Sequence, residues 1–404
     1  MEKQQSKKPL IRFPEFKYAW EHKRLNELLS EAKKRNEDLK YGKDEVLSVS
    51  RELGIINQIE HLGRSYAGVS VHQYHVVEIG DIVYTKSPLK NNPYGIIKVN
   101  QSKPGIVSTL YAVYKVNKNI ADGLYLDYYF SLESNTNNYL RPLVRKGAKN
   151  DMKVNNAYVL HDKIFIPSYQ EQIKIAVFFK LLDEKINELK SKLDLLEKYK
   201  IGIMQQLFSQ KLRFKNENGK EFPNWKLLKI GQLFTERSEK GYSDLELLSV
   251  SMNTGVQKKS DTSKTDNSSN DKSNYKKVDL NDIVYNSMRM WQGASGVSKY
   301  IGIVSPAYTV ITPNPLVNST YFGFLFKTKK MINIFERNSQ GLTSDTWNLK
   351  FPQLSKIELI VPDIEEQNKI ASFLTSIDEK INRTENQIQQ TQQYKKGLLQ
   401  SMFI

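Results

Sequence analysis

Side chains that could support covalent or metal chemistry are scarce in this 404-residue chain. It contains no cysteine, which excludes disulfides, thiolate zinc sites and a cysteine nucleophile. Two of its five histidines, His72 and His75, lie close in sequence, but no third metal ligand accompanies them. The signatures of phosphate-binding loops and of serine nucleophile elbows are both absent. We therefore predict no catalytic residue and no metal site.

One short string, Asn91-Asn92-Pro93-Tyr94, resembles the Asn-Pro-Pro-Tyr loop with which amino-methyltransferases hold the exocyclic amine of a flipped base. The second proline of that loop is absent, and the chain has no glycine-rich cofactor turn after a strand. An Asn-Pro pair is also a common turn signal. The string is therefore interpreted as a turn and not as a catalytic loop.

Four stretches combine polar, basic and aromatic side chains, two in each half of the chain. In each half the first stretch follows an Asp-Ile-Val-Tyr sequence, at 81–84 or 282–285, and the second lies near Gly147 or Gly341. The donors of these side chains fit base edges and also hold phosphates. A solvated loop has the same composition, so the matching placement in both halves is the stronger argument. We predict DNA-binding residues in the first half at Lys86, Ser87, Lys90, Asn91, Asn92, Tyr94, Arg141, Arg145, Lys146, Lys149 and Asn150, and in the second at Arg289, Trp291, Gln292, Gln340, Ser344 and Lys350.

An internal repeat carries these stretches. The sequence of 166–209 recurs at 361–404 without a gap, so that Glu171-Gln172 matches Glu366-Gln367. Each copy predicts one helix of about 40 residues, or roughly 60 Å. Ser168-x-x-Glu171 and Asp363-x-x-Glu366 predict capping boxes, in which the glutamate reaches back to the cap.

Apolar residues within each copy follow alternating steps of three and four, which predicts that the two helices pack on each other. Lys200 interrupts this seam in the first copy, and Thr384, Thr391 and Lys395 interrupt it in the second, which is therefore expected to be the weaker half. The alternative is two amphipathic helices, each packed on its own domain. The predicted seam residues are Phe179, Leu182, Ile186, Leu189, Leu193, Leu196, Ile203, Leu207, Leu374, Ile377, Ile381, Ile388, Leu398 and Met402.

The repeat extends beyond the helices. An Arg-Phe pair and a following tryptophan occur near the start of each half, Leu-Ser-Val-Ser occurs at 47–50 and 248–251, and Gly-Ile-Val-Ser occurs at 105–108 and 302–305. A short amphipathic helix is expected after each tryptophan, and single aromatic-rich helices are expected over 125–141 and 321–337. Between these shared parts, 51–80 and 252–281 have almost nothing in common. The chain is therefore predicted to contain two related domains that recognise different ligands or different target sequences.

The net charge of +16 is distributed unevenly. Lysine and arginine exceed aspartate and glutamate by 26 to 18 over 1–165 and by 22 to 14 over 210–361, but stand at 7 to 6 over 166–209 and 5 to 6 over 362–404. The excess therefore belongs to the two domains, +8 each, and not to the helices. Two equally basic domains on a neutral framework favour binding to a polyanion.

Two variable domains that alternate with two nearly identical long helices, each opened by Pro-x-x-x-Glu-Gln, resemble the specificity (S, HsdS) subunit of type I restriction–modification systems. The resemblance covers essentially the whole chain, although the helix entry departs from the usual Pro-Leu-Pro pattern. It implies an α+β fold: two mixed α/β target recognition domains and an antiparallel coiled coil, with a pseudo-two-fold internal duplication. The expected boundaries are 1–165 and 210–361 for the domains, and 166–209 and 362–404 for the helices.

The resemblance also implies a function. Each domain would recognise one half of a bipartite double-stranded DNA target, and the helices would set the unread spacer. Two methyltransferase subunits would dock on the helices and use S-adenosylmethionine to methylate adenine, and a motor–nuclease subunit using ATP and Mg would cut unmodified DNA. This chain would bind no cofactor and catalyse nothing itself.

Two alternative functions compete with this one. The chain could be the recognition part of a fused restriction–methylation enzyme, which the complete two-domain framework and its end at the second helix disfavour. It could also be a structural coiled-coil adaptor, which the charge on each domain disfavours. The chain has no run of 18 apolar residues and no secretory signal, so a cytoplasmic protein with no membrane partner is expected.

Overall fold

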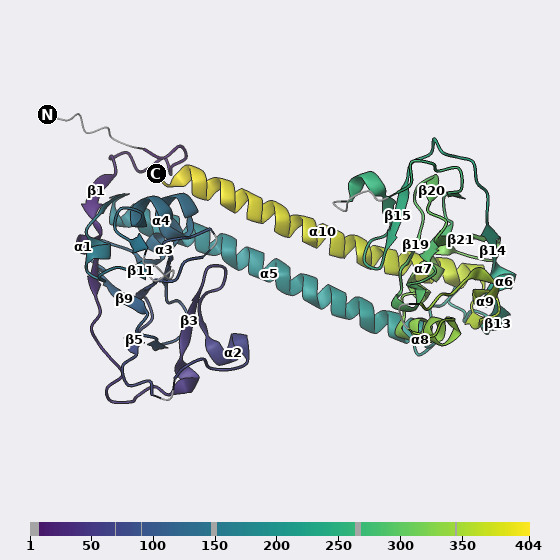
Figure 1. Cartoon of the computed structure of the whole chain (residues 1–404), viewed down its shortest axis with the longest axis horizontal. Helices are drawn as coiled ribbons and strands as arrows, with labels where there is room; N and C mark the ends of the chain where they lie inside the picture. The colour runs from purple at the N-terminus through teal and green to yellow at the C-terminus, as the bar shows by residue number, and fades with distance from the viewer. Residues whose placement is uncertain (1–7, 69, 90, 147–151, 263–267, 344–345) are drawn as a thin grey trace. The chain divides into compact units, whose positions relative to one another are not determined.

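The computed structural model describes residues 8–68, 70–89, 91–146, 152–262, 268–343 and 346–404. The chain forms two compact units (Figure 1). The first comprises Met1–Lys190 and Asn386–Ile404, and the second comprises Ser191–Glu385. Each unit therefore contains a globular part, the beginning of one long helix and the end of the other.

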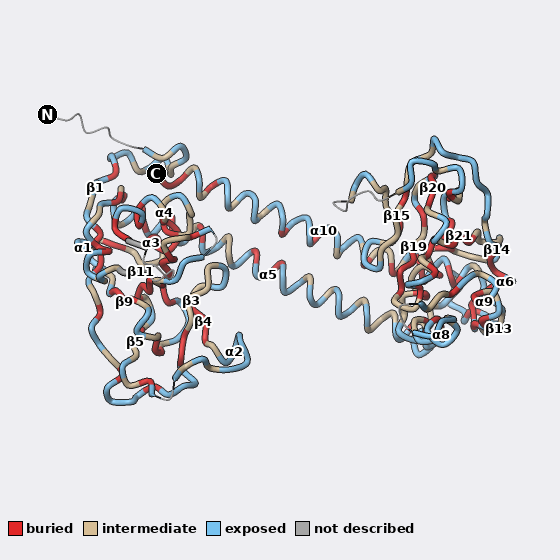
Figure 2. Tube along the Cα trace, viewed as in Figure 1, coloured by how far each residue is buried: buried red, intermediate tan, exposed pale blue. Residues whose placement is uncertain are grey.

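The two long helices predicted from the repeat are present. Helix α5 spans Tyr169–Phe208 and helix α10 spans Ile364–Met402. Buried positions recur at intervals along both helices, with exposed positions between them (Figure 2). In the described part of the chain, no helix combines the length and the apolar character needed to span a membrane.

The first unit is organised around a four-stranded antiparallel sheet in the order β2-β9-β6-β7. These strands are Leu29–Glu31, Tyr111–Val116, Ile82–Thr85 and Ile96–Val99. Two-stranded pairs surround the sheet: β1 (Glu21–Arg24) with β12 (Lys163–Ile166), β3 (Leu47–Ser50) with β4 (Gly54–Asn57), β5 (His75–Val77) with β8 (Gly105–Val107), and β10 (Arg145–Lys146) with β11 (Met152–Lys153). Its shorter helices are α1 (Leu25–Leu28), α2 (Gln58–Leu62), α3 (Gly123–Ser131) and α4 (Glu133–Leu140).

The second unit repeats this plan with a four-stranded antiparallel sheet in the order β14-β21-β18-β19. These strands are Phe234–Arg237, Tyr308–Pro313, Ile283–Asn286 and Ser295–Val297. The strand pairs are β13 (Lys226–Lys229) with β22 (Glu358–Val361), β15 (Leu248–Ser251) with β16 (Gly255–Lys258), and β17 (Lys276–Val278) with β20 (Gly302–Val304). Its shorter helices are α6 (Ile230–Leu233), α7 (Ser319–Leu325), α8 (Lys329–Asn338) and α9 (Phe351–Leu354). The matching topology confirms the predicted α+β fold and internal duplication.

The short repeated sequences occur where the fold leaves little choice of residue. Asp81 and Asp282 each accept a backbone N–H, from Glu78 and Asp279, at 2.8 Å, and so close the turn before β6 or β18. A Cβ added to Gly105 would lie 2.5 Å from the carbonyl oxygen of Glu45. The same addition at the equivalent glycine of the second unit would meet a carbonyl oxygen at 2.4 Å. Only glycine allows these strands to approach so closely.

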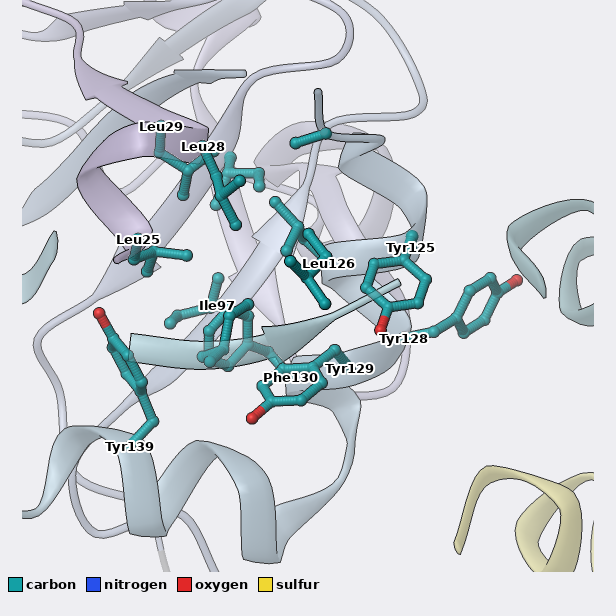
Figure 3. Packing of buried hydrophobic residues seen from close by; sticks show 14 of the residues in the cluster. Leu25, Leu28, Leu29, Ile97, Tyr125, Leu126, Tyr128, Tyr129, Phe130 and Tyr139 are labelled. Carbon is teal, nitrogen blue, oxygen red and sulfur yellow. The ribbon is translucent and has the colours of Figure 1, made fainter. Parts of the chain in front are cut away.

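The core of the first unit lies between the sheet and α3. Tyr125, Leu126 and Phe130 of α3 pack beside Ile97 of β7, with Leu25 and Leu28 of α1 nearby (Figure 3). Tyr128 points away from these side chains (Figure 3), and its hydroxyl donates to Asp183 of α5 at 2.8 Å. Helix α3 therefore joins the sheet to the long helix.

The Glu-Gln pair that opens α5 anchors the globular part to the helix. Ser168 caps the helix as predicted, since its Oγ accepts the backbone N–H of Glu171 at 3.4 Å. The prediction that the glutamate reaches back to the cap is wrong. Glu171 is fully buried and accepts Nε and Nη2 of Arg12 at 2.7 Å each, and it also accepts Nε1 of Trp20 at 3.4 Å. A buried carboxylate needs hydrogen-bond donors and a compensating positive charge; Arg12 supplies the charge, and Trp20 adds a neutral donor.

The second copy uses the same arrangement. The carboxylate of Glu366 accepts Arg213 at 3.1 and 2.7 Å and the indole N–H of Trp225 at 2.9 Å. Its cap, Asp363, accepts the backbone N–H of Glu366 at 2.9 Å. The repeated Arg-Phe and tryptophan sequences are therefore the partners of the repeated glutamate.

The aromatic-rich helices expected over 125–141 and 321–337 are each two helices, which corrects the prediction. The backbone is extended at Leu132, between α3 and α4, and at Thr328, between α7 and α8. Thr328 caps α8 by accepting the N–H of Met331. The helix expected after Trp20 is also shorter, because Leu29 begins strand β2 and Leu25–Leu28 forms a single turn.

Within each unit the two long helices run antiparallel. In the first unit the ring of Phe403 stacks on Phe179 at 5.9 Å, and Lys395 forms an ion pair with Asp183. Residue numbers therefore increase along α5 in the direction in which they decrease along α10. This confirms the antiparallel coiled coil. Every predicted seam residue is buried or half-buried.

The lysines that interrupt the seam are paired in both units. Lys395 contacts Asp183 and lies 5.1 Å from the ring centroid of Tyr128. In the second unit Lys200 is 2.5 Å from Asp378 and 5.3 Å from the ring centroid of Phe324. Each lysine from the end of one helix thus meets an aspartate near the start of the other and an aromatic residue of the globular part.

Candidate nucleic-acid interface

In the second unit, the two predicted DNA-binding stretches lie against each other. The first forms a short 3₁₀ turn, η4 (Met290–Gln292), shortly after β18, and the second follows α8. The rings of Trp291 and Trp347 meet edge to face at 5.1 Å. The backbone N–H of Leu349 donates to the carbonyl of Ser287 at 2.8 Å. Two segments about 50 residues apart in sequence therefore form one surface.

The second of these stretches closes into a hairpin-like loop. Gln340 and Asn348 exchange backbone hydrogen bonds of 3.0 and 2.8 Å, which close its base. Gln340 and Lys350 are exposed, whereas Leu349 is fully buried and holds the end of the loop in the core. Predicted residue Ser344 lies outside the described residues.

Lys327 holds the backbone next to the first stretch through hydrogen bonds. Its ammonium donates to the carbonyls of Gly293 and Met252, at 2.5 and 2.8 Å. Burial, together with the positive charge of Lys200, lowers the pKa of Lys327 to about 8. Arg289 is exposed, and Trp291 and Gln292 are half-buried. The framework thus fixes the backbone of this stretch and leaves the Arg289 side chain in solvent.

In the first unit the loop after β6 contacts α4 in a comparable way. The side-chain amide of Asn137 donates to the carbonyl of Asn91 at 3.0 Å. Asn137 also accepts the backbone N–H of Arg141 through its own carbonyl at 2.9 Å. The loop after β6 is therefore tied to α4, the helix that ends next to Arg141.

The side chains of the first unit differ in accessibility. Ser87, Asn91 and Arg141 are exposed, and Tyr94 is half-buried with its carbonyl accepting the hydroxyl of Tyr84 at 2.7 Å. Asn92 is only 3% exposed, so its amide faces protein and not solvent in this structure. Predicted residues Arg145 and Lys146 form strand β10. Lys90, Lys149 and Asn150 lie outside the described residues.

Lys86, the first residue after β6, belongs to a group of charged side chains. Burial lowers the pKa of Lys86, while the carboxylate of Glu31 raises it and Arg35 lowers it. The neighbouring His75 is almost fully buried, and burial together with Arg35 and Lys86 lowers its pKa to about 4. Among the described residues its Nδ1 has no hydrogen-bond partner. At neutral pH the buried imidazole of His75 is therefore uncharged.

The described residues offer no metal-ligand cluster of three or more histidine, aspartate or glutamate side chains. The exposed side chains described above are hydrogen-bond donors and cations. Such groups suit the recognition of phosphates and base edges.

Sequence reasoning missed several residues of this surface. Trp347 and Lys327 were not singled out, although one packs on a predicted residue and the other supports the backbone beside it. Asn137 was missed in the first unit. The internal repeat could have suggested them, because each lies on or beside the paired aromatic-rich helices.

Comparison with known proteins shows which protein family the second unit resembles. Residues 223–392 match the family described as the type I restriction modification DNA specificity domain. This segment begins before β13, ends within α10 and includes both stretches of the second unit. Most of the second unit therefore matches a type I DNA specificity domain, and the resemblance predicted from the sequence is confirmed.

Individual relatives agree with this class. A Methanocaldococcus jannaschii protein assigned as the type I restriction enzyme MjaX specificity subunit is 25% identical over 168 residues, which are 40% of this chain and 39% of the relative. The match therefore spans less than half of that curated relative. The crystal structure of the type I restriction–modification S subunit from M. genitalium superposes with a TM-score of 0.56 at 12% identity, covering 98% of this chain and 99% of that one. A chain from a structure on assembly and conformational transition of the type I R-M system gives 0.51 at 14% identity, with 96% and 97% covered. These structures show that the fold extends over the whole chain.

Proposed function

We propose that this chain is the sequence-specific DNA-recognition subunit of a type I restriction–modification complex and has no catalytic activity of its own. Each unit recognises one half of a bipartite double-stranded target. The observation that carries the proposal is the duplicated framework whose loops differ at equivalent places, after β6 and after β18. A framework kept alike while its exposed loops diverge suits two domains that bind different sequences.

The long helices set the unread spacer and dock two methyltransferase subunits. A helix of 40 residues is about 60 Å long, which suffices to separate half-sites one helical turn, about 34 Å, apart. Two copies of one partner match the duplicated framework, as in closed two-fold assemblies. S-adenosylmethionine belongs to those partners, and ATP and Mg belong to a motor–nuclease subunit.

The test is methylation sequencing of DNA from cells that carry this chain together with its candidate methyltransferase, compared with cells that lack only this chain. We expect a new bipartite motif with one modified adenine in each half. A complex that assembles but leaves no new motif would contradict the proposal. Methyl transfer by the purified chain alone would show that the chain is instead part of an enzyme.

A further inference from the structure

The loop between Gln340 and Asn348 presents an apolar side chain entirely to solvent. Leu342 is 101% exposed, which is more than any other large apolar side chain in the described part of the chain. A single exposed leucine is unremarkable on most surfaces. Here it belongs to one of the two stretches that form the proposed DNA-recognition surface of the second unit.

The described ends of the loop that carries Leu342 are fixed by backbone contacts. Backbone bonds between Gln340 and Asn348 close its base, and the N–H of Thr346 donates to the carbonyl of Thr343 at 2.9 Å. Gly341 has φ +149°, and a Cβ at this position would lie 2.6 Å from the carbonyl oxygen of Thr346. Glycine therefore lets the two sides of the loop approach closely, and Leu342 follows it directly.

The surroundings of the loop combine aromatic support with positive charge. The ring of Trp347, near the end of the loop, packs on Trp291. This contact links the loop to the segment after β18. Arg289, Arg337 and Lys350 are exposed on the segments that lead into and out of this region. An apolar partner pocket would have to accommodate these cations, whereas nucleic acid offers phosphates for them and an apolar stack for the leucine.

We propose that Leu342 inserts into the base stack of the half-target bound by the second unit and unstacks one base step. Apolar side chains of this kind act as wedges, and the cost of unstacking is offset by contacts to the deformed duplex. The proposal rests on the proposed function. It adds a role there, because an adenine must leave the stack before a partner can methylate it, and an opened neighbouring step makes this easier.

The test uses the assembled complex of this chain with its methyltransferase and a duplex of the motif found by methylation sequencing. 2-Aminopurine, which fluoresces when unstacked, replaces one base at a time across the half-target. The variants are Leu342→Ala, Leu342→Phe and the matched control Leu280→Ala. Leu280 is 55% exposed in the same unit but precedes β18, whereas the recognition segment follows that strand.

For the unmodified complex and for the Leu280→Ala control we expect a several-fold fluorescence increase at one position. The Leu342→Ala complex should lose this increase and bind the target about tenfold more weakly, and Leu342→Phe should retain the increase. An undiminished increase with Leu342→Ala would overturn the wedge while leaving the proposed function intact. Failure of the Leu342→Ala chain to assemble with the methyltransferase would instead make Leu342 a protein contact. Absence of DNA binding by the unmodified complex would refute the proposed function itself.

Discussion

The ion pair between Lys395 and Asp183 should measurably hold the end of α10 to the start of α5. The Asp183 carboxylate also accepts the hydroxyl of Tyr128 at 2.8 Å, so Asp183→Asn preserves the shape but removes the charge. The Lys395 ammonium, 19% exposed, would then lack its partner beside an apolar seam. Asp183 is 39% exposed, so solvent screens part of the interaction. We expect the substitution to cost roughly 1 to 2 kcal/mol of local stability.

The assay is a double-mutant cycle with Asp183→Asn and Lys395→Met, read by hydrogen exchange of the amides in 386–404, which reports the opening free energy of that segment. We expect a coupling energy of about 1 kcal/mol. The control cycle uses Asp194 and Lys198, an exposed pair 2.8 Å apart on α5, read on the neighbouring α5 amides. The control coupling should stay below about 0.5 kcal/mol. Equal couplings in the two cycles would refute the view that the Lys395–Asp183 pair holds the end of α10 to the start of α5.

Three further predictions concern the anchor, the buried histidine and DNA binding. Glu171→Gln leaves the guanidinium of Arg12 without a carboxylate and should lower the unfolding free energy of the first unit by roughly 3 kcal/mol. The assay is urea denaturation followed through the fluorescence of Trp20, with the second unit as the internal control. An unchanged unfolding free energy would contradict the role of Glu171 as an anchor. The folded state lowers the pKa of His75 from 6.5 to about 4, so protons bind the unfolded chain first and stability is lost as the pH falls from 6.5 towards 4. His75→Phe should remove up to about 3 kcal/mol of that pH-dependent loss, whereas identical pH profiles would show that the imidazole is not the group responsible. Arg289→Ala should weaken DNA binding by the assembled complex and reduce the salt dependence of that binding, because phosphate contacts release counterions. The control is Lys299→Ala, which removes an exposed lysine elsewhere in the same unit and should change binding less. A flat salt response of the unmodified complex would count against DNA as the ligand.

The long helices and the duplicated plan could be predicted because they depend on local and periodic features. A repeat without gaps, helix caps and three- and four-residue steps are all present in the linear sequence. Two errors came from local rules that tertiary contacts overrode. Glu171 fits a capping box, yet its carboxylate is used by Arg12 and Trp20, which lie more than 150 residues earlier. The helix over 125–141 breaks at Leu132, where nothing in the local composition marks an end.

The candidate interface divides in the same way. Sequence composition pointed to the stretches after β6 and β18 and after the aromatic helices. It could not show that Asn92 is buried, or that Trp291 meets Trp347, because burial and contact depend on how distant segments pack. The role of Lys395 is similar, since a lysine within a heptad pattern indicates a weak seam until its aspartate is known.

What the sequence determined by itself was the architecture: two related basic domains, two matching long helices and the class of protein that combines them. These follow from periodicity, charge distribution and repetition, which need no knowledge of distance. The tertiary structure alone decided which side chains meet. It placed Glu171 on Arg12, Lys395 on Asp183 and Trp347 on Trp291, and it left Leu342 in solvent. The physical reason is that a buried charge or an exposed apolar group is defined by its neighbours, and folding brings those neighbours from remote parts of the chain.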